Sequence, residues 1–150
     1  MNLKSIRRKA EKILNLLQES NDLSRDEEIE VSILLTDNEH IAFLNEEYRQ
    51  SKGATDVLSF PNDASFPTPG HFFLGDLAIS LEKAKEQALE NGLKRSDEIT
   101  ILLVHSFLHL LGYTHEGEKS GGDNEDGVKM RSKEQEILQK LGFTHGLMGR

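Results

Sequence analysis

The first third of the chain shows two hydrophobic periodicities in succession. Apolar residues three or four positions apart in the segment 3–17 predict an amphipathic helix that ends near Asn21. Between Ile29 and Leu35 apolar residues take every second position, which predicts a strand with one buried face. Thr36 to Glu39 has the form of a capping box, so we expect a second helix to start there.

Two further strands and a third helix are predicted in the middle of the chain. Residues 57–60 are rich in β-formers and precede the segment 61–70, which holds all three prolines and is expected to be a surface loop. The run 72–79 predicts the next strand. Ser80 is a suitable N-cap for a helix that ends at Gly92.

The last third of the chain is predicted to be helical around one loop. Ser96, followed by two acidic residues, is expected to open a helix, and residues 99–111 within it are apolar on nearly every side, which is typical of a central, buried helix. Gly112 is placed to end this helix in a left-handed turn. Residues 116–127 are acidic and glycine-rich and predict a loop, and residues 130–141 predict a last helix. This order of elements indicates one α+β, or mixed α/β, domain over residues 1–150, with about five helices.

Composition limits the classes of function. The 150 residues are 36% hydrophobic and 29% charged, which is typical of a globular domain. No apolar segment reaches the roughly 20 residues that span a bilayer, and no continuous apolar stretch follows the basic N-terminus, so we expect neither a membrane span nor a signal peptide, and a cytoplasmic location. Without cysteine, any metal must be held by histidines and carboxylates. At a net charge of −8, binding of nucleic acid would need locally concentrated positive charge.

Three histidines carry the strongest chemical signal. His105 and His109 lie four residues apart in the predicted buried helix and therefore share one of its faces. His115 follows Gly112, where a turn allows the chain to double back toward the same point. Buried imidazoles need partners for their nitrogens, and three neutral imidazoles with one open position are typical of catalytic zinc. We therefore predict one zinc ion per chain, bound by His105, His109 and His115.

The same spacing overlays the H-E-x-x-H-x-x-G-x-x-H motif of the metzincin proteases. Those enzymes use the glutamate after the first histidine as a general base, whereas this chain has Ser106, which cannot take up a proton at neutral pH. Glu116 and Asp56 are candidate replacements that the spacing does not place near the ion. A metallopeptidase is therefore the second hypothesis. The remaining histidines are expected to bind no metal: His40, His71 and His145.

The run His105-Ser-Phe-Leu-His109-Leu-Leu-Gly-Tyr-Thr-His115 resembles the signature of the bacterial YbeY-type family of metal-dependent endoribonucleases. Two further motifs of that family have counterparts in this chain: Leu44, Asn45, Tyr48 and Arg49 with Thr55 to Pro61, and Leu74 to Asp76 with Ile79 and Ser80. Ser106 and Thr114 stand where the family usually has glycine and aspartate. Neither of these two is a metal ligand.

The resemblance implies a mixed sheet of about four strands packed by helices, with a zincin-like central helix that carries the histidines. It also implies a single-strand-specific endoribonuclease that acts in ribosomal RNA processing, in 16S rRNA 3′-end maturation and in ribosome biogenesis, with rRNA and the ribosomal subunit as partners. Arg49 is then the candidate catalytic residue, because a guanidinium can hold a phosphate by two parallel hydrogen bonds. Either water or the RNA 2′-hydroxyl would attack. A ribosome-assembly factor with a structural zinc is the alternative outside the enzymes.

Overall fold

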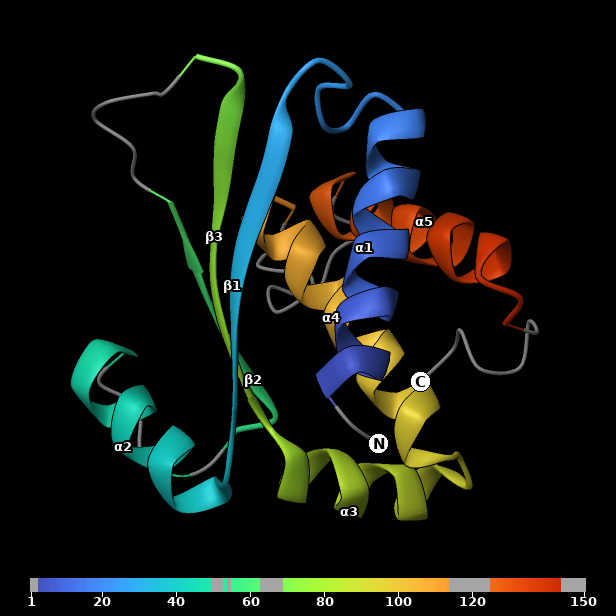
Figure 1. Ribbon diagram of the computed structural model, residues 1–150. Helices are drawn as coiled ribbons and strands as arrows, with labels where there is room; N and C mark the ends of the chain where they lie inside the picture. Colours follow the sequence, from blue (N-terminus) through green and yellow to red (C-terminus); the bar gives the residue numbers. More distant parts are fainter. Residues whose placement is uncertain (1–2, 50–52, 54, 63–68, 114–124, 144–150) are drawn as a thin grey trace.

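The computed structural model describes residues 3–49, 53, 55–62, 69–113 and 125–143, which form five α-helices and one three-stranded sheet (Figure 1). The helices are α1 (Leu3–Glu19), α2 (Asn38–Arg49), α3 (Leu81–Asn91), α4 (Arg95–Leu110) and α5 (Glu125–Lys140). The strands are β1 (Glu28–Thr36), β2 (Val57–Pro61) and β3 (His71–Ser80). The α+β class and the five helices are confirmed. The expected count of about four strands is wrong for the described residues, because each of the three segments with strand periodicity supplies one strand and the rest is helical or connecting chain.

The sheet is mixed, with β3 in its centre. β1 pairs with β3 in parallel and β2 pairs with β3 in antiparallel orientation. Helices α1, α4 and α5 lie on one side of this sheet, α2 lies on the other side, and α3 crosses one end (Figure 1). The main core lies between the sheet and the first group of helices, and the alternating apolar residues of β1 pack against it: Ile29, Val31, Ile33 and Leu35.

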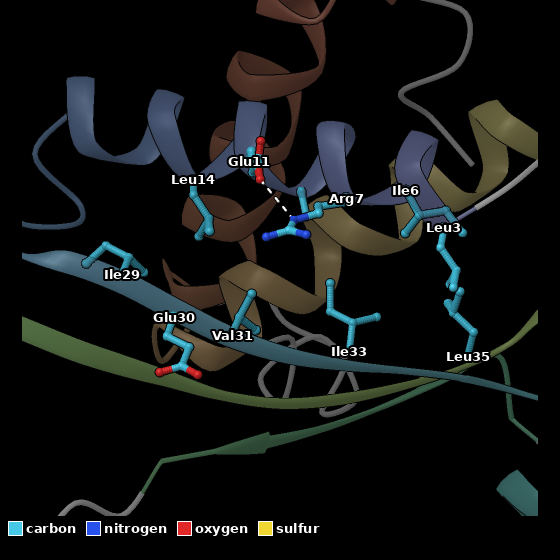
Figure 2. Close-up of a pocket in the computed structure, with 11 residues that line it drawn as sticks. Leu3, Ile6, Arg7, Glu11, Leu14, Ile29, Glu30, Val31, Ile33 and Leu35 are labelled. Atoms are coloured by element: carbon cyan, nitrogen blue, oxygen red, sulfur yellow. Dashed lines mark ion pairs between the residues drawn. The ribbon is translucent and has the colours of Figure 1, made fainter.

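Helix α1 covers β1 as its apolar stripe predicts. Its buried residues are Ile6, Ala10, Ile13 and Leu17, at the spacing of one helix face. A groove of about 380 Å³ remains between α1 and β1, with the exposed ion pair between Arg7 and Glu11 at its edge (Figure 2). Aliphatic side chains form most of its lining, and none of the candidate catalytic or metal-binding residues is among them. This groove is therefore separate from the predicted chemistry.

Helix starts were predicted less well than helix ends. Helix α2 begins at Asn38, because the Asp37 carboxylate accepts the His40 N–H at 2.8 Å, whereas Thr36 ends β1 and pairs there with Ser80. The N-cap of α4 is Lys94, which makes no side-chain cap bond, and not the predicted Ser96.

Helix α5 also begins earlier than expected. Residues 125–127 were assigned to the acidic loop but form its first turn, so the helix starts five residues before the predicted Met130.

The predicted boundaries of α3 are confirmed. The Ser80 hydroxyl accepts the Lys83 N–H at 3.1 Å, and Gly92 ends the helix in the left-handed region at φ 67°.

In β3, Gly75 has a φ of 149°, and a Cβ there would lie 2.5 Å from the Phe60 carbonyl oxygen and 2.8 Å from Leu110 Cδ2. Glycine at this position thus allows β2 and the end of α4 to approach β3 closely.

Candidate metal centre on helix α4

Helix α4 is the buried central helix that the sequence predicts, and it leaves one stripe partly open. Between Glu98 and Leu110, every fourth residue is only partly buried (Ile101, His105 and His109), and all the others are buried. These three positions lie on one side of the helix because four residues complete about one turn. The two histidines therefore sit at the edge of the core, within reach of a ligand and supported by packed neighbours.

The two imidazoles converge through the same ring nitrogen. His105 Nε2 and His109 Nε2 lie 2.9 Å apart, and the ring centroids are 4.5 Å apart with an angle of 76° between the ring planes. Two nitrogens bound to one tetrahedral zinc, each about 2.05 Å from the ion, would be separated by about 3.3 Å. A small opening of this contact would suit both rings to a shared ion. The two residues therefore fit the predicted metal.

The third predicted ligand, His115, lies outside the described residues. The chain before it turns as predicted: Gly112 has a φ of 100°, its N–H donates to the His109 carbonyl at 3.0 Å, and the Tyr113 N–H donates to the Leu108 carbonyl at 3.0 Å. Among the described residues no group of three histidines and carboxylates is arranged to hold a metal ion. The three-histidine centre thus stays a prediction, with two members in a fitting geometry.

Glu134 on α5 is a site residue that sequence reasoning missed. Its Oε1 lies 2.6 Å from His105 Nδ1, the ring nitrogen on the opposite side from the His109 contact. Both side chains are largely shielded from solvent, with 33% of His105 and 21% of Glu134 exposed. Because 29 residues separate them in sequence, only the packing of α5 against α4 brings them together.

The side chains of Ser106 and Asp56 form hydrogen bonds with backbone groups. The Ser106 hydroxyl is fully buried and donates to the Leu102 carbonyl at 2.6 Å, so it faces the core and not the imidazole pair. The Asp56 carboxylate accepts the Val57 N–H at 2.8 Å at the start of β2. Neither arrangement is that of a general base at the metal, and the other candidate base, Glu116, lies outside the described residues.

Arg49 is the last residue of α2, and its side chain is outside the described part of the structure. His71 pairs with Glu30 at 2.8 Å, and the His40 ring stacks on Phe43; these contacts involve neither His105 nor His109. His145 lies outside the described residues.

A polar cluster beside the candidate centre joins three separate segments. Asp22, between α1 and β1, accepts a hydrogen bond from the Tyr113 hydroxyl at 3.0 Å and pairs with Lys133 of α5 at 2.6 Å. Burial would by itself raise the pKa of the Asp22 carboxyl, but hydrogen bonds from Lys133, Ser20 and Tyr113 and the charge of Lys133 hold that pKa below its ordinary value. For Lys133, burial lowers the pKa, but Asp22 and Glu136 together raise it above the usual value.

These pKa directions predict how stability depends on pH. Since the Asp22 pKa is lower in the folded state than in the unfolded chain, its contribution is complete above the ordinary carboxyl pKa and is lost as the pH falls through the folded value. Asp22→Asn is expected to lower the free energy of unfolding at neutral pH by about 1–2 kcal/mol. The difference from wild type should shrink below about pH 4. Urea unfolding at several pH values measures this.

Asp26→Asn is the matched control, because Asp26 lies in the same connection and is exposed. It should leave the unfolding free energy nearly unchanged. An Asp22→Asn deficit that stays constant down to pH 2 would contradict a carboxylate stabilised by these partners.

Comparisons with known proteins identify relatives over nearly the whole chain. A family model described as "Endoribonuclease YbeY" matches residues 1–142. Among curated relatives, the "Endoribonuclease YbeY" of Nautilia profundicola is 42% identical over 137 residues, covering 91% of this chain and 88% of the relative. That of Carboxydothermus hydrogenoformans is 44% identical over 138 residues, covering 89% of each.

The fold is shared with a solved structure. The solution structure of a Thermotoga maritima protein matches with a TM-score of 0.55 at 23% identity, over 91% of this chain and 85% of the other. No helix in the described part of the structure has both the length and the apolar character needed to cross a membrane.

Proposed function

The chain belongs to the endoribonuclease YbeY family, and we propose that it cleaves single-stranded ribosomal RNA with one zinc ion bound by His105, His109 and His115. One observation carries the zinc part of the proposal: two imidazoles on one face of α4 present their Nε2 atoms to each other at 2.9 Å. We further propose that the enzyme acts in the cytoplasm on the ribosomal subunit, in 16S rRNA 3′-end maturation and ribosome biogenesis.

In the proposed mechanism the histidines bind the metal and Arg49 binds the phosphate. The imidazoles of His105 and His109 on α4 would hold the ion, with His115 as the third ligand in the proposal. A bound zinc ion supplies Lewis acidity toward the scissile phosphodiester. The Arg49 guanidinium grips the same phosphate by two hydrogen bonds and stabilises the charge that develops there during attack by water or by the RNA 2′-hydroxyl.

The charge of the chain sets how RNA would bind. With a net charge of −8, the protein as a whole repels a polyanion, so attraction must come from locally concentrated positive charge, which in the proposal is the ion and a few basic side chains such as Arg49. The metallopeptidase hypothesis receives no support from the site, since Ser106 occupies the position of the protease glutamate and its hydroxyl is bonded inside the core.

The activity is tested with two substrates in parallel. We expect the zinc-loaded protein to cleave a single-stranded RNA that carries the 3′ end of 16S rRNA. It should leave an unfolded protein substrate intact, since Ser106 and not a glutamate follows His105. Removing the metal with a chelator should abolish cleavage, and added zinc should restore it. Gel analysis of labelled RNA measures both results.

The outcomes separate the three hypotheses. Chelator-sensitive proteolysis without RNA cleavage would favour the metallopeptidase. Bound zinc with no cleavage of any RNA would favour the assembly factor with a structural metal. A 2′,3′-cyclic phosphate on the product would identify the 2′-hydroxyl as the attacking group.

A further inference from the structure

We propose that Glu134 is a positioning residue that fixes His105 in the tautomer whose unprotonated Nε2 faces His109. The inference rests on the proposed metal site, but it concerns a contact between two side chains of this chain. It adds a residue of α5 to a centre that the sequence attributes to α4 and the segment after it.

The 2.6 Å contact determines which ring nitrogen of His105 carries the proton. An ionised carboxylate can only accept hydrogen bonds, so a neutral His105 must donate from Nδ1 to Glu134 Oε1. Its Nε2 is then unprotonated and carries a lone pair. His109 Nε2, 2.9 Å away, is the donor to that lone pair in the metal-free protein. The carboxylate thus orients His105 so that the lone pair of Nε2 faces the second imidazole.

The position of Glu134 also excludes it as a direct participant at the ion. The carboxylate contacts Nδ1, whereas the two Nε2 atoms meet on the other side of the His105 ring. A carboxylate behind a metal-binding imidazole holds the ring orientation and increases the basicity of the ligating nitrogen. Glu134 therefore acts through His105, as an orienting acceptor.

Helix α5 holds Glu134 in place from both sides. Met130, Ile137 and Leu138 are buried in the main core, and Glu134 shares their side of the helix, at four residues from Met130 and from Leu138. The neighbouring Lys133 ties the same turn to Asp22 at 2.6 Å. An acidic residue within an apolar helix stripe needs a polar partner, and His105 is such a partner.

The test uses the full-length protein with Glu134→Gln and Glu134→Ala. Glu136→Gln is the matched control, because Glu136 lies two residues further along α5, is more exposed, and pairs with Lys133 and Lys140. The first measurement is ¹⁵N NMR of the imidazoles in metal-free protein, at a pH well above the ordinary imidazole range. The second is zinc affinity by competition with a chromophoric chelator.

We expect wild type and Glu136→Gln to show His105 protonated at Nδ1. Glu134→Ala should show a mixture of the two tautomers and bind zinc about 10- to 100-fold more weakly, with Glu134→Gln between them because its amide can still accept one hydrogen bond. Melting temperatures of the metal-free proteins identify any variant that is unfolded. If Glu134→Ala does not fold, the tautomer and zinc affinity of Glu134→Gln, which keeps the shape of the side chain, test the inference.

An unchanged tautomer together with unchanged zinc affinity in both variants would overturn the inference. Absence of zinc binding by the wild type would instead refute the proposed metal site, and the NMR result would still decide the role of Glu134.

Discussion

The His109→Ala variant is expected to lose most of its zinc and to cleave RNA about a thousandfold more slowly than the wild type. His109 supplies one of the two Nε2 atoms that converge on α4, so its removal leaves an incomplete ligand set. Lewis-acid assistance contributes several kcal/mol to a transition state, and each 1.36 kcal/mol is a factor of about ten in rate. Metal analysis of the purified variant and single-turnover cleavage measure the two losses.

His71→Ala is the matched control. His71 is a histidine of β3 that pairs with Glu30, so its loss should leave zinc content and cleavage unchanged. The melting temperature of the zinc-loaded protein should fall only in His109→Ala, because metal binding is coupled to the stability of the folded state. Full zinc occupancy in His109→Ala would refute the three-histidine assignment.

Local patterns predicted the part of the site that lies on one helix. The spacing of His105 and His109 within an apolar run was sufficient to place both imidazoles on one face, and the structure brings their Nε2 atoms together there. The turn at Gly112 and the cap at Ser80 were likewise predicted, since a left-handed glycine and a serine N-cap act within a few residues. Interactions of this range depend on neighbours in the sequence.

Contacts between distant elements were not predictable in this way. Glu134 reaches His105 only because α5 packs on α4, and Asp22 reaches Lys133 only because both segments meet beside Tyr113. The periodicity of α5 assigns Glu134 to the side of Met130, which was the available signal, but it does not name the partner. Sequence reasoning also assigned the start of α2 to Thr36, because Thr36 and Asp37 are both good caps and only the sheet pairing of Thr36 distinguishes them.

Arg49→Ala is expected to slow cleavage at saturating RNA far more than it weakens RNA binding. If the guanidinium meets the phosphate chiefly as charge develops, its loss removes stabilisation from the transition state and not from the bound substrate. The expected loss is about 2–4 kcal/mol, or roughly 30- to 1,000-fold in rate, the range for a single preorganised donor. Single-turnover cleavage and RNA titration measure the two effects separately.

Two further variants, together with zinc content and melting temperature, decide whether charge, geometry or folding is responsible. Arg49→Lys keeps the charge but loses the two-pronged hydrogen bonding, so it should restore only part of the rate. Arg8→Ala, on the exposed side of α1, removes one positive charge elsewhere and should cleave like the wild type. Zinc content and melting temperature should stay unchanged in all of them, because Arg49 ends α2 and is not a metal ligand in the proposal. If Arg49→Ala cleaves RNA at the wild-type rate, the phosphate must be held by another group, and the catalytic assignment contracts to the histidines and their ion.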